Sequence, residues 1–110
     1  MNTLYLLLGS NMGNSKTQLA KAIRNIEMQI GKATRQSSIY TTAAWGNTKQ
    51  PDFLNQVIIV KTKLNAEQTR KTILSNEKKM GRVRTVKNAP RIIDIDILFF
   101  NKEIIDEPDL

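Results

Sequence analysis

The stretch that most constrains this chain lies between Gly81 and Leu98, where a basic segment leads into an apolar strand that carries two carboxylates. Successive side chains of a strand point to opposite faces, so Asp94 and Asp96 share one face and the isoleucines around them share the other. Two carboxylates side by side repel each other unless a positive charge lies near them. Ionised aspartates in so apolar a strand therefore need a physical reason.

A divalent metal ion would supply such a charge, because Mg²⁺ is typically held by one or two carboxylates together with substrate phosphates. The arginines of the same stretch, Arg82, Arg84 and Arg91, carry forked donors that suit phosphate oxygens. The pattern predicts a site for magnesium and a polyphosphate. The alternative is that the acid pair and the basic run are two solvated surfaces.

Composition narrows the chemistry of any such site. The 110 residues include no cysteine and no histidine, which excludes disulfides in this stretch of chain and favours oxygen-bound Mg²⁺, Mn²⁺ or Ca²⁺ over zinc. The length suits a single domain, and the net charge of +7 favours polyanionic ligands such as nucleotides, nucleic acid or anionic lipid. No apolar run is long enough for a membrane span or a signal peptide, so we expect a cytoplasmic protein.

Hydrophobic patterning predicts four strands, at Leu4–Leu8, Thr34–Thr42, Phe53–Thr62 and Ile92–Phe100. Two helices are predicted between them: Ser15 caps the first and Gly31 ends it, and Asn65 caps the second and Gly81 ends it. The order β-α-β-β-α-β indicates an α+β, ferredoxin-like fold, a four-stranded antiparallel sheet with both helices on one face. We expect the two acids on the other face.

Phe53 and Asn55 are predicted to share that open face. An aromatic ring beside an amide suits a flat heterocycle, because the ring stacks on it while the amide offers a donor and an acceptor. The alternative is that Phe53 belongs to the core, as strand aromatics commonly do.

Several short blocks, spread over nearly all of the chain, carry a resemblance to a known family. They are Leu8-Gly9-Ser10-Asn11, Tyr40-Thr41-Thr42 with Trp45-Gly46, Gln50-Pro51-Asp52-Phe53-Leu54-Asn55, Glu77 with Gly81-Arg82-Val83-Arg84, and Pro90-Arg91-Ile92-Ile93-Asp94-Ile95-Asp96-Ile97. In their order and spacing they resemble the 6-hydroxymethyl-7,8-dihydropterin pyrophosphokinases, folate-pathway enzymes that transfer pyrophosphate from ATP to a pterin alcohol. The last two blocks together are highly specific.

The resemblance implies roles at a nucleotide site. Asp94 and Asp96 would hold two Mg²⁺ ions that bridge the phosphates of ATP. Arg82 and Arg91 would contact the phosphates and act in catalysis by stabilising charge during transfer. The remaining implied nucleotide contacts are Arg84, Glu77 as a supporting residue, and Ile97 beside the adenine.

The resemblance also implies a pterin pocket, with a small-molecule pterin as partner and neither nucleic acid nor membrane. Phe53 would stack on the pterin and Asn55 would hydrogen-bond to its polar edge. The residues expected to line the rest of the pocket are Thr42, Ala43, Ala44 and Trp45.

Family members continue beyond the point where this sequence ends, into a Val-Pro-His-Pro-type motif and a last helical segment. We therefore expect residues 1–110 to be one pyrophosphokinase domain without the family's C-terminal segment. The resemblance implies a monomer, whereas an apolar surface left by the missing segment could let the chain self-associate.

The sequence is also compatible with two other functions. A ferredoxin-like nucleic-acid-binding module would suit the charge, but such modules read bases with two or three exposed aromatics on central strands. Here the first strand offers only Tyr5, the third offers only Phe53, and no RNP-type motif is present. A domain that binds a metabolite without chemistry is the other alternative.

Overall fold

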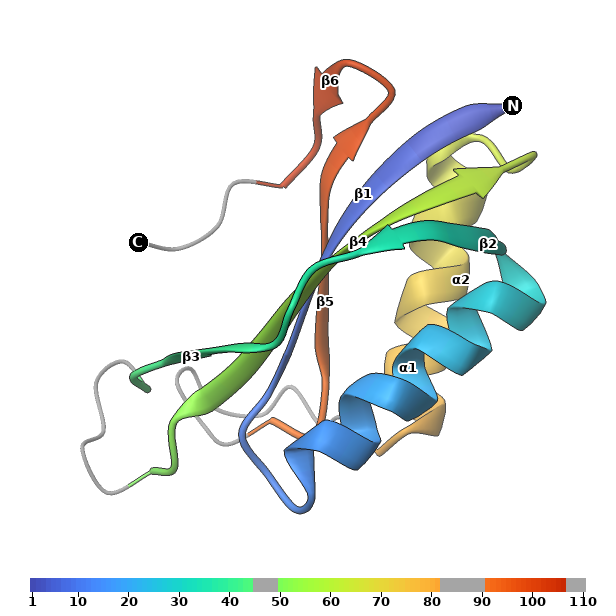
Figure 1. Ribbon diagram of the computed structural model, residues 1–110. Coiled ribbons are helices and arrows are strands. Elements are labelled where there is room, and N and C mark those ends of the chain that lie inside the picture. Colours follow the sequence, from blue (N-terminus) through green and yellow to red (C-terminus); the bar gives the residue numbers. More distant parts are fainter. Residues whose placement is uncertain (45–49, 82–90, 107–110) are drawn as a thin grey trace.

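The architecture is one antiparallel sheet with two helices packed against one of its faces (Figure 1). A computed structural model describes residues 1–44, 50–81 and 91–106. In chain order the elements are β1 (Asn2–Ser10), α1 (Ser15–Gln29), β2 (Gly31–Gln36), β3 (Tyr40–Thr42), β4 (Phe53–Thr62), α2 (Ala66–Lys79), β5 (Asp94–Phe100) and β6 (Glu103–Ile104). An α+β fold with two helices is thus confirmed.

The sheet runs in the order β2-β4-β1-β5-β6, and β3 pairs with β4 beyond the end of β2. Every pairing is antiparallel. Six strands appear in the described parts of the chain, so the prediction of a four-stranded sheet is wrong in its count. Two short strands, β3 and β6, account for the difference. The long strands β1 and β4 lie side by side in the middle (Figure 1).

The single strand predicted at Thr34–Thr42 is divided into β2 and β3 because Ser37 interrupts the ladder. The Ser37 hydroxyl accepts the N–H of Val57 over 2.9 Å, a bond that a main-chain carbonyl would otherwise make. The Ser37 carbonyl instead accepts from the side-chain amide of Gln56, also over 2.9 Å. A serine that competes with the main chain in this way cannot be recognised from strand propensity.

The core lies between the sheet and the helices. Alternate residues of β1 and β5 are buried there, which is the period-2 pattern of a strand with one covered face. The largest fully buried side chains of this core are Leu4, Leu6, Leu8, Leu19, Ile26, Ile58, Val60 and Ile93. Burying each such side chain contributes roughly 1.5–3 kcal/mol. Ile95 and Ile97 of β5 belong to the same core, so the isoleucine face of this strand is the one that packs against the helices.

Polar groups satisfy the ends of the helices. Asn14, not Ser15, caps α1, and its Oδ1 accepts the N–H of Thr17 over 3.1 Å. The prediction was wrong by one residue because both side chains are good caps. Asn65 caps α2 as predicted. Gly81 follows α2 with a φ of 94°, a conformation that favours glycine.

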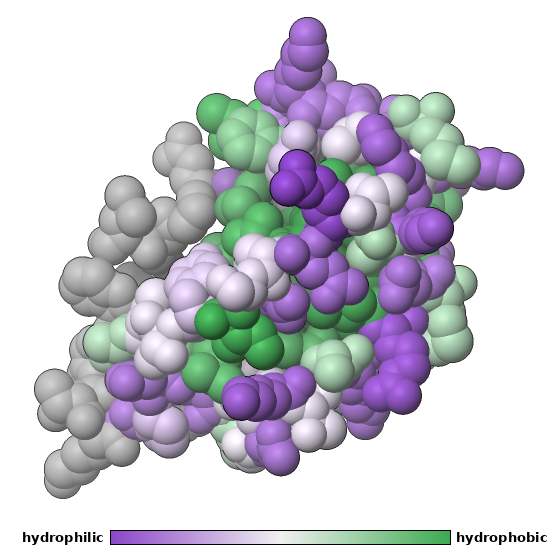
Figure 2. Space-filling model, viewed as in Figure 1, coloured by the Kyte–Doolittle hydropathy of each residue, from purple (hydrophilic) through white to green (hydrophobic). Residues whose placement is uncertain are grey.

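The outer face of the helices is largely polar, as Figure 2 shows on the side of the molecule where α1 and α2 lie. Neither helix that the structure describes combines the length and the apolar character that a bilayer crossing requires.

Gly31 ends the helical segment for a different reason from the one predicted. It is the first residue of β2, and a Cβ at this position would stand 1.9 Å from the carbonyl oxygen of Lys61. Only a residue without a side chain allows this close approach of two main chains.

We predict that Gly31→Ala lowers the free energy of unfolding by about 1–3 kcal/mol, because β2 must move away from β4 to admit the methyl group. Chemical denaturation of both proteins would measure it. Lys32→Ala, at the exposed neighbouring position, is the control and should change stability by no more than about 0.5 kcal/mol. Equal effects of the two substitutions would contradict the close-approach explanation.

Candidate active site

The sheet face opposite the helices brings the predicted metal acids and the predicted pterin residues into neighbouring positions. Gly9 of β1 pairs with Asn55 of β4 on one side and with Asp94 of β5 on the other. Directly paired residues of antiparallel strands point to the same face, so these three form one row across three strands. In the next row on this face, Leu7 pairs with Asp96.

Gly9 is buried in the middle of this row, and its lack of a side chain leaves room for the side chains of Asn55 and Phe53 beside it. A Cβ there would stand 3.2 Å from Oδ1 of Asn55 and 3.7 Å from Cδ1 of Phe53. Any side chain at this position would therefore occupy the space beside the ring and the amide. The predicted first strand ended at Leu8 and missed this role; β1 continues to Ser10 because it remains paired with β4 there.

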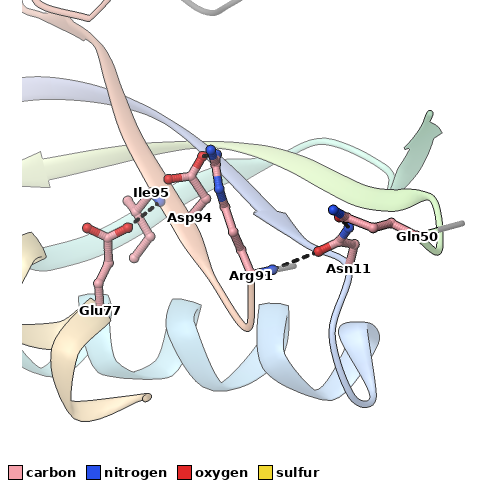
Figure 3. Close-up of polar contacts among 6 residues, drawn as sticks. All are labelled: Asn11, Gln50, Glu77, Arg91, Asp94 and Ile95. Atoms are coloured by element: carbon pink, nitrogen blue, oxygen red, sulfur yellow. Dashed lines mark hydrogen bonds and ion pairs between the residues drawn. The ribbon is translucent and has the colours of Figure 1, made fainter. Parts of the chain in front are cut away.

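Arg91 lies against one of the two acids. Its Nη1 donates to Oδ2 of Asp94 over 3.0 Å (Figure 3). The two side chains are 32% and 18% exposed, so solvent screens their attraction less than at an open surface. The structure thus places a forked cationic donor next to the acid pair.

The two carboxylates of the acid pair suit a cation that takes its remaining ligands from a bound substrate. Asp94 and Asp96 are partly exposed while Ile95 between them is buried. Across residues 1–44, 50–81 and 91–106, no group of three or more acid, histidine or cysteine side chains could hold a metal ion. A cation bound here would take most of its ligands from phosphate oxygens and water, which is the usual coordination of Mg²⁺ at phosphate sites.

Asn11, whose residue surface is only 2% exposed, joins three segments at this end of the sheet. Its Oδ1 accepts the N–H of Arg91 over 2.8 Å, and its own N–H donates to the Arg91 carbonyl over 3.1 Å. Its Nδ2 donates to Oε1 of Gln50 over 3.0 Å (Figure 3). The same Nδ2 donates to the carbonyl of Pro51 over 3.2 Å. One amide therefore positions the segments that lead into β4 and into β5.

Sequence reasoning did not identify Asn11 as a site residue, although it belongs to one of the family-like blocks. Its partners lie 39 and 80 residues away along the chain. No local pattern reports contacts over such a separation, so only the resemblance pointed to this position.

The short strand β3 orients the predicted pterin residues. Thr42 pairs with Phe53, and Tyr40 pairs with Asn55. Nδ2 of Asn55 donates to Oγ1 of Thr42 over 2.9 Å. The amide donor of Asn55 is thus engaged by β3, and its Oδ1 is the atom nearest to the position that a Cβ of Gly9 would take.

Other predicted site residues take different places. Glu77, 2% exposed, accepts the main-chain N–H of Ile95 on Oε2 over 3.0 Å (Figure 3). The side chain of Ile97 is buried in the core and does not reach the open face. Ala43 and Ala44 follow β3 directly. The predicted residues that lie outside the described residues are Trp45, Arg82 and Arg84.

The sequence matches a known family over almost its whole length. The model of the 7,8-dihydro-6-hydroxymethylpterin-pyrophosphokinase (HPPK) family matches residues 5–109. The chain belongs to the HPPK family. The resemblance seen in the sequence blocks is thereby confirmed.

Curated HPPK relatives come from several organisms. The 2-amino-4-hydroxy-6-hydroxymethyldihydropteridine pyrophosphokinase of Bacillus subtilis is 37% identical over 110 residues, which are 99% of this chain and 66% of the relative. That of Aquifex aeolicus is 41% identical over 107 residues, 96% of this chain and 65% of the relative. The chain thus spans about two thirds of the length of these relatives.

Solved structures share the fold. A crystal structure of an HPPK-DHPS in complex with substrates aligns with a TM-score of 0.74 at 21% identity, covering 99% of this chain and 29% of that one. The Plasmodium falciparum HPPK-DHPS with STZ-DHP aligns with a TM-score of 0.70 at 22% identity, covering 91% of this chain and 27% of that one. At these identities the likeness concerns the fold alone.

We predict that Asn11→Ala lowers the free energy of unfolding by about 2–3 kcal/mol, because it leaves several buried donors and acceptors unpaired. Gln50→Ala, which removes one of the partners of Asn11, should cost about 1 kcal/mol. Chemical denaturation measures both. Asn25→Ala on α1 is the control and should stay within about 0.5 kcal/mol of the parent. A loss at Asn11 no larger than at Gln50 would contradict its role as the joint of three segments.

Proposed function

We propose that this protein transfers pyrophosphate from ATP to the hydroxymethyl group of 6-hydroxymethyl-7,8-dihydropterin, releasing AMP, in folate biosynthesis. Membership of the HPPK family supports this. The observation that carries the proposal is the row Asn55, Gly9 and Asp94, with Phe53 near one end and Arg91 at the other. Groups suited to a flat heterocycle and groups suited to a phosphate thus share one open face.

At the pterin end, Phe53 stacks on the ring and Oδ1 of Asn55 accepts a hydrogen bond from its polar edge. Because β3 already binds the amide donor of Asn55, the orientation of that Oδ1 is set before ligand arrives. Such preorganisation lowers the cost of ordering the site on binding. The residues that we propose line the rest of the pocket are Thr42, Ala43, Ala44 and Trp45.

At the phosphate end, Asp94 and Asp96 hold two Mg²⁺ ions together with the phosphates of ATP. When bound, these ions offset the negative charge of the phosphate oxygens. Arg91, already in contact with Asp94, turns its guanidinium toward the transferred group. The further nucleotide contacts that we propose are Arg82 and Arg84, with Glu77 in a supporting role; Ile97, whose side chain is buried in the core, is not among them.

In the reaction, the pterin hydroxyl oxygen forms a bond to the β-phosphorus of ATP. The bond from that phosphorus to the oxygen bridging to the α-phosphate breaks, AMP leaves, and the hydroxyl proton passes to solvent. A loose transition state of this kind needs little assistance from a strong base. Catalysis by this chain is then mainly the alignment of hydroxyl and phosphate, and the stabilisation of charge by Arg82 and Arg91.

We also infer that the long strands and both helices follow the ferredoxin-like plan, with β3 and β6 as additions, and that residues 1–110 belong to one pyrophosphokinase domain. The strand order β2-β4-β1-β5 and the antiparallel pairings support this. Because the chain spans about two thirds of its relatives' length, ligand binding is a sharper test of the site than turnover.

We predict that Asp94→Ala weakens Mg²⁺-dependent ATP binding at least about tenfold, since one of the two proposed metal carboxylates is lost. Titration calorimetry with ATP at several Mg²⁺ concentrations measures it. Glu67→Ala, which removes an exposed acid from α2, is the control and should bind as the parent does. Unchanged affinity and metal dependence in Asp94→Ala would overturn the proposed role. Stronger binding of polyanions in general would favour a nucleic-acid-binding module instead.

We predict that Phe53→Ala weakens pterin binding by about 1–3 kcal/mol, because stacking and burial of the ring are lost. ATP affinity in the absence of pterin should stay unchanged. Calorimetric titration with the pterin measures the first effect and titration with Mg–ATP the second. Full pterin affinity in the variant would overturn the stacking role of Phe53.

A further inference from the structure

The outer edge of β5 is not covered by a strand where it carries the acid pair. On one side β5 pairs with β1 along its length. On the other side β6 pairs only with Phe99 and Phe100, and within the described residues no strand pairs with Asp94–Leu98 there. An edge of this kind leaves main-chain N–H groups that require other acceptors.

Two carboxylates accept these N–H groups. The N–H of Ile95 donates to Oε2 of Glu77 over 3.0 Å, and the N–H of Ile97 donates to Oδ2 of Asp106 over 2.9 Å. Each N–H belongs to the peptide group that directly follows one of the acids, Asp94 or Asp96. Glu77 and Asp106 therefore hold one acid-bearing peptide each, and we call them the edge clamp.

Asp106 holds β5 by more than one bond. Its own N–H donates to the carbonyl of Ile97 over 2.8 Å, so both polar groups of that residue's main chain are bound. Its Oδ1 lies 3.5 Å from Nη2 of Arg70 on α2. Since Glu77 also belongs to α2, both halves of the edge clamp connect the edge of β5 to this helix.

The two acids must be held in place because their carboxylates repel each other on one face of the strand. A rotation of either peptide group would swing the attached side chain and change the separation of the carboxylates. Sites for metals and phosphates work only when their ligands are held within about 0.5 Å. Carboxylates are strong acceptors for such a purpose, since charge-assisted hydrogen bonds are shorter and stronger than neutral ones.

We propose that the edge clamp positions Asp94 and Asp96 for Mg²⁺, acting through the main chain of β5 and not as metal ligands. The hydrogen bonds that Glu77 and Asp106 accept from the main chain of β5 support the second part. This inference rests on the proposed function, in which the acid pair holds magnesium. It adds Asp106 as a positioning residue and gives Glu77 a defined structural role.

Asp106 offers the better test, because its side chain is 31% exposed whereas Glu77 is buried. Three variants would be compared for the Mg²⁺ concentration that half-saturates ATP binding: Asp106→Ala, Asp106→Asn and Glu103→Ala. Asn retains an oxygen that can accept the N–H of Ile97, and Glu103, exposed on β6, is the matched loss of one negative charge. Hydrogen exchange of the Ile97 amide reports the clamp directly.

We expect Asp106→Ala to raise the half-saturating Mg²⁺ concentration about tenfold, in the range common for outer-shell partners of metal ligands. Its Ile97 amide should exchange faster and its pterin affinity should not change. Asp106→Asn should raise it less than Asp106→Ala does, because its side chain still accepts the bond, although without the charge. Glu103→Ala should match the parent.

The outcomes separate the two proposals. If Asp106→Ala binds Mg–ATP as the parent does although the Ile97 amide exchanges faster, the edge clamp has no positioning role. Equal losses in Asp106→Ala and Asp106→Asn would likewise overturn it in favour of a charge effect. In both cases Asp94→Ala still tests the magnesium site by itself. Should Asp106→Ala not fold, Glu77→Ala against Glu77→Gln makes the same comparison at Ile95.

Discussion

The candidate site depends on the pairing of β1 with β4 on one side and with β5 on the other. These two ladders bring together residues that are far apart in the chain and set which of them stand opposite one another. Because the side-chain period of a strand is two, a slip of one residue would turn the acids into the core and the isoleucines to solvent. The fully buried Leu4, Leu6 and Leu8 oppose such a slip, since it would expose them.

The block that follows these leucines shows how one short segment serves packing and site together. Gly9, without a side chain, leaves room for the Asn55 amide and the Phe53 ring beside it. Ser10 is fully buried, and its hydroxyl meets that of Ser15 at the start of α1 over 3.3 Å. Asn11 joins the segments that lead into the two neighbouring strands. Each of these three residues of the family-like block therefore has its own physical role.

Prediction from sequence worked best where the evidence was local and repetitive. The bounds of β4 agree with the prediction, because an apolar run rich in β-branched residues marks this strand. The strand expected at Thr34–Thr42 failed at Ser37, where one hydroxyl replaces a ladder carbonyl. No element is predicted after Phe100, yet the residues that follow contribute β6 and Asp106, which bond to β5 after a chain reversal at Asn101 and Lys102.

The sequence by itself determined the fold class, the faces of the acid-bearing strand and, through its blocks, the family, because periodicity and motif spacing are properties of neighbouring residues. Only the tertiary structure decided that Gly9 separates Asn55 from Asp94, that Asn11 joins three segments, and that two carboxylates hold the edge of β5. These features consist of hydrogen bonds and close approaches between segments distant in the chain. Their partners are chosen by strand register and packing, which exist only after the chain has folded.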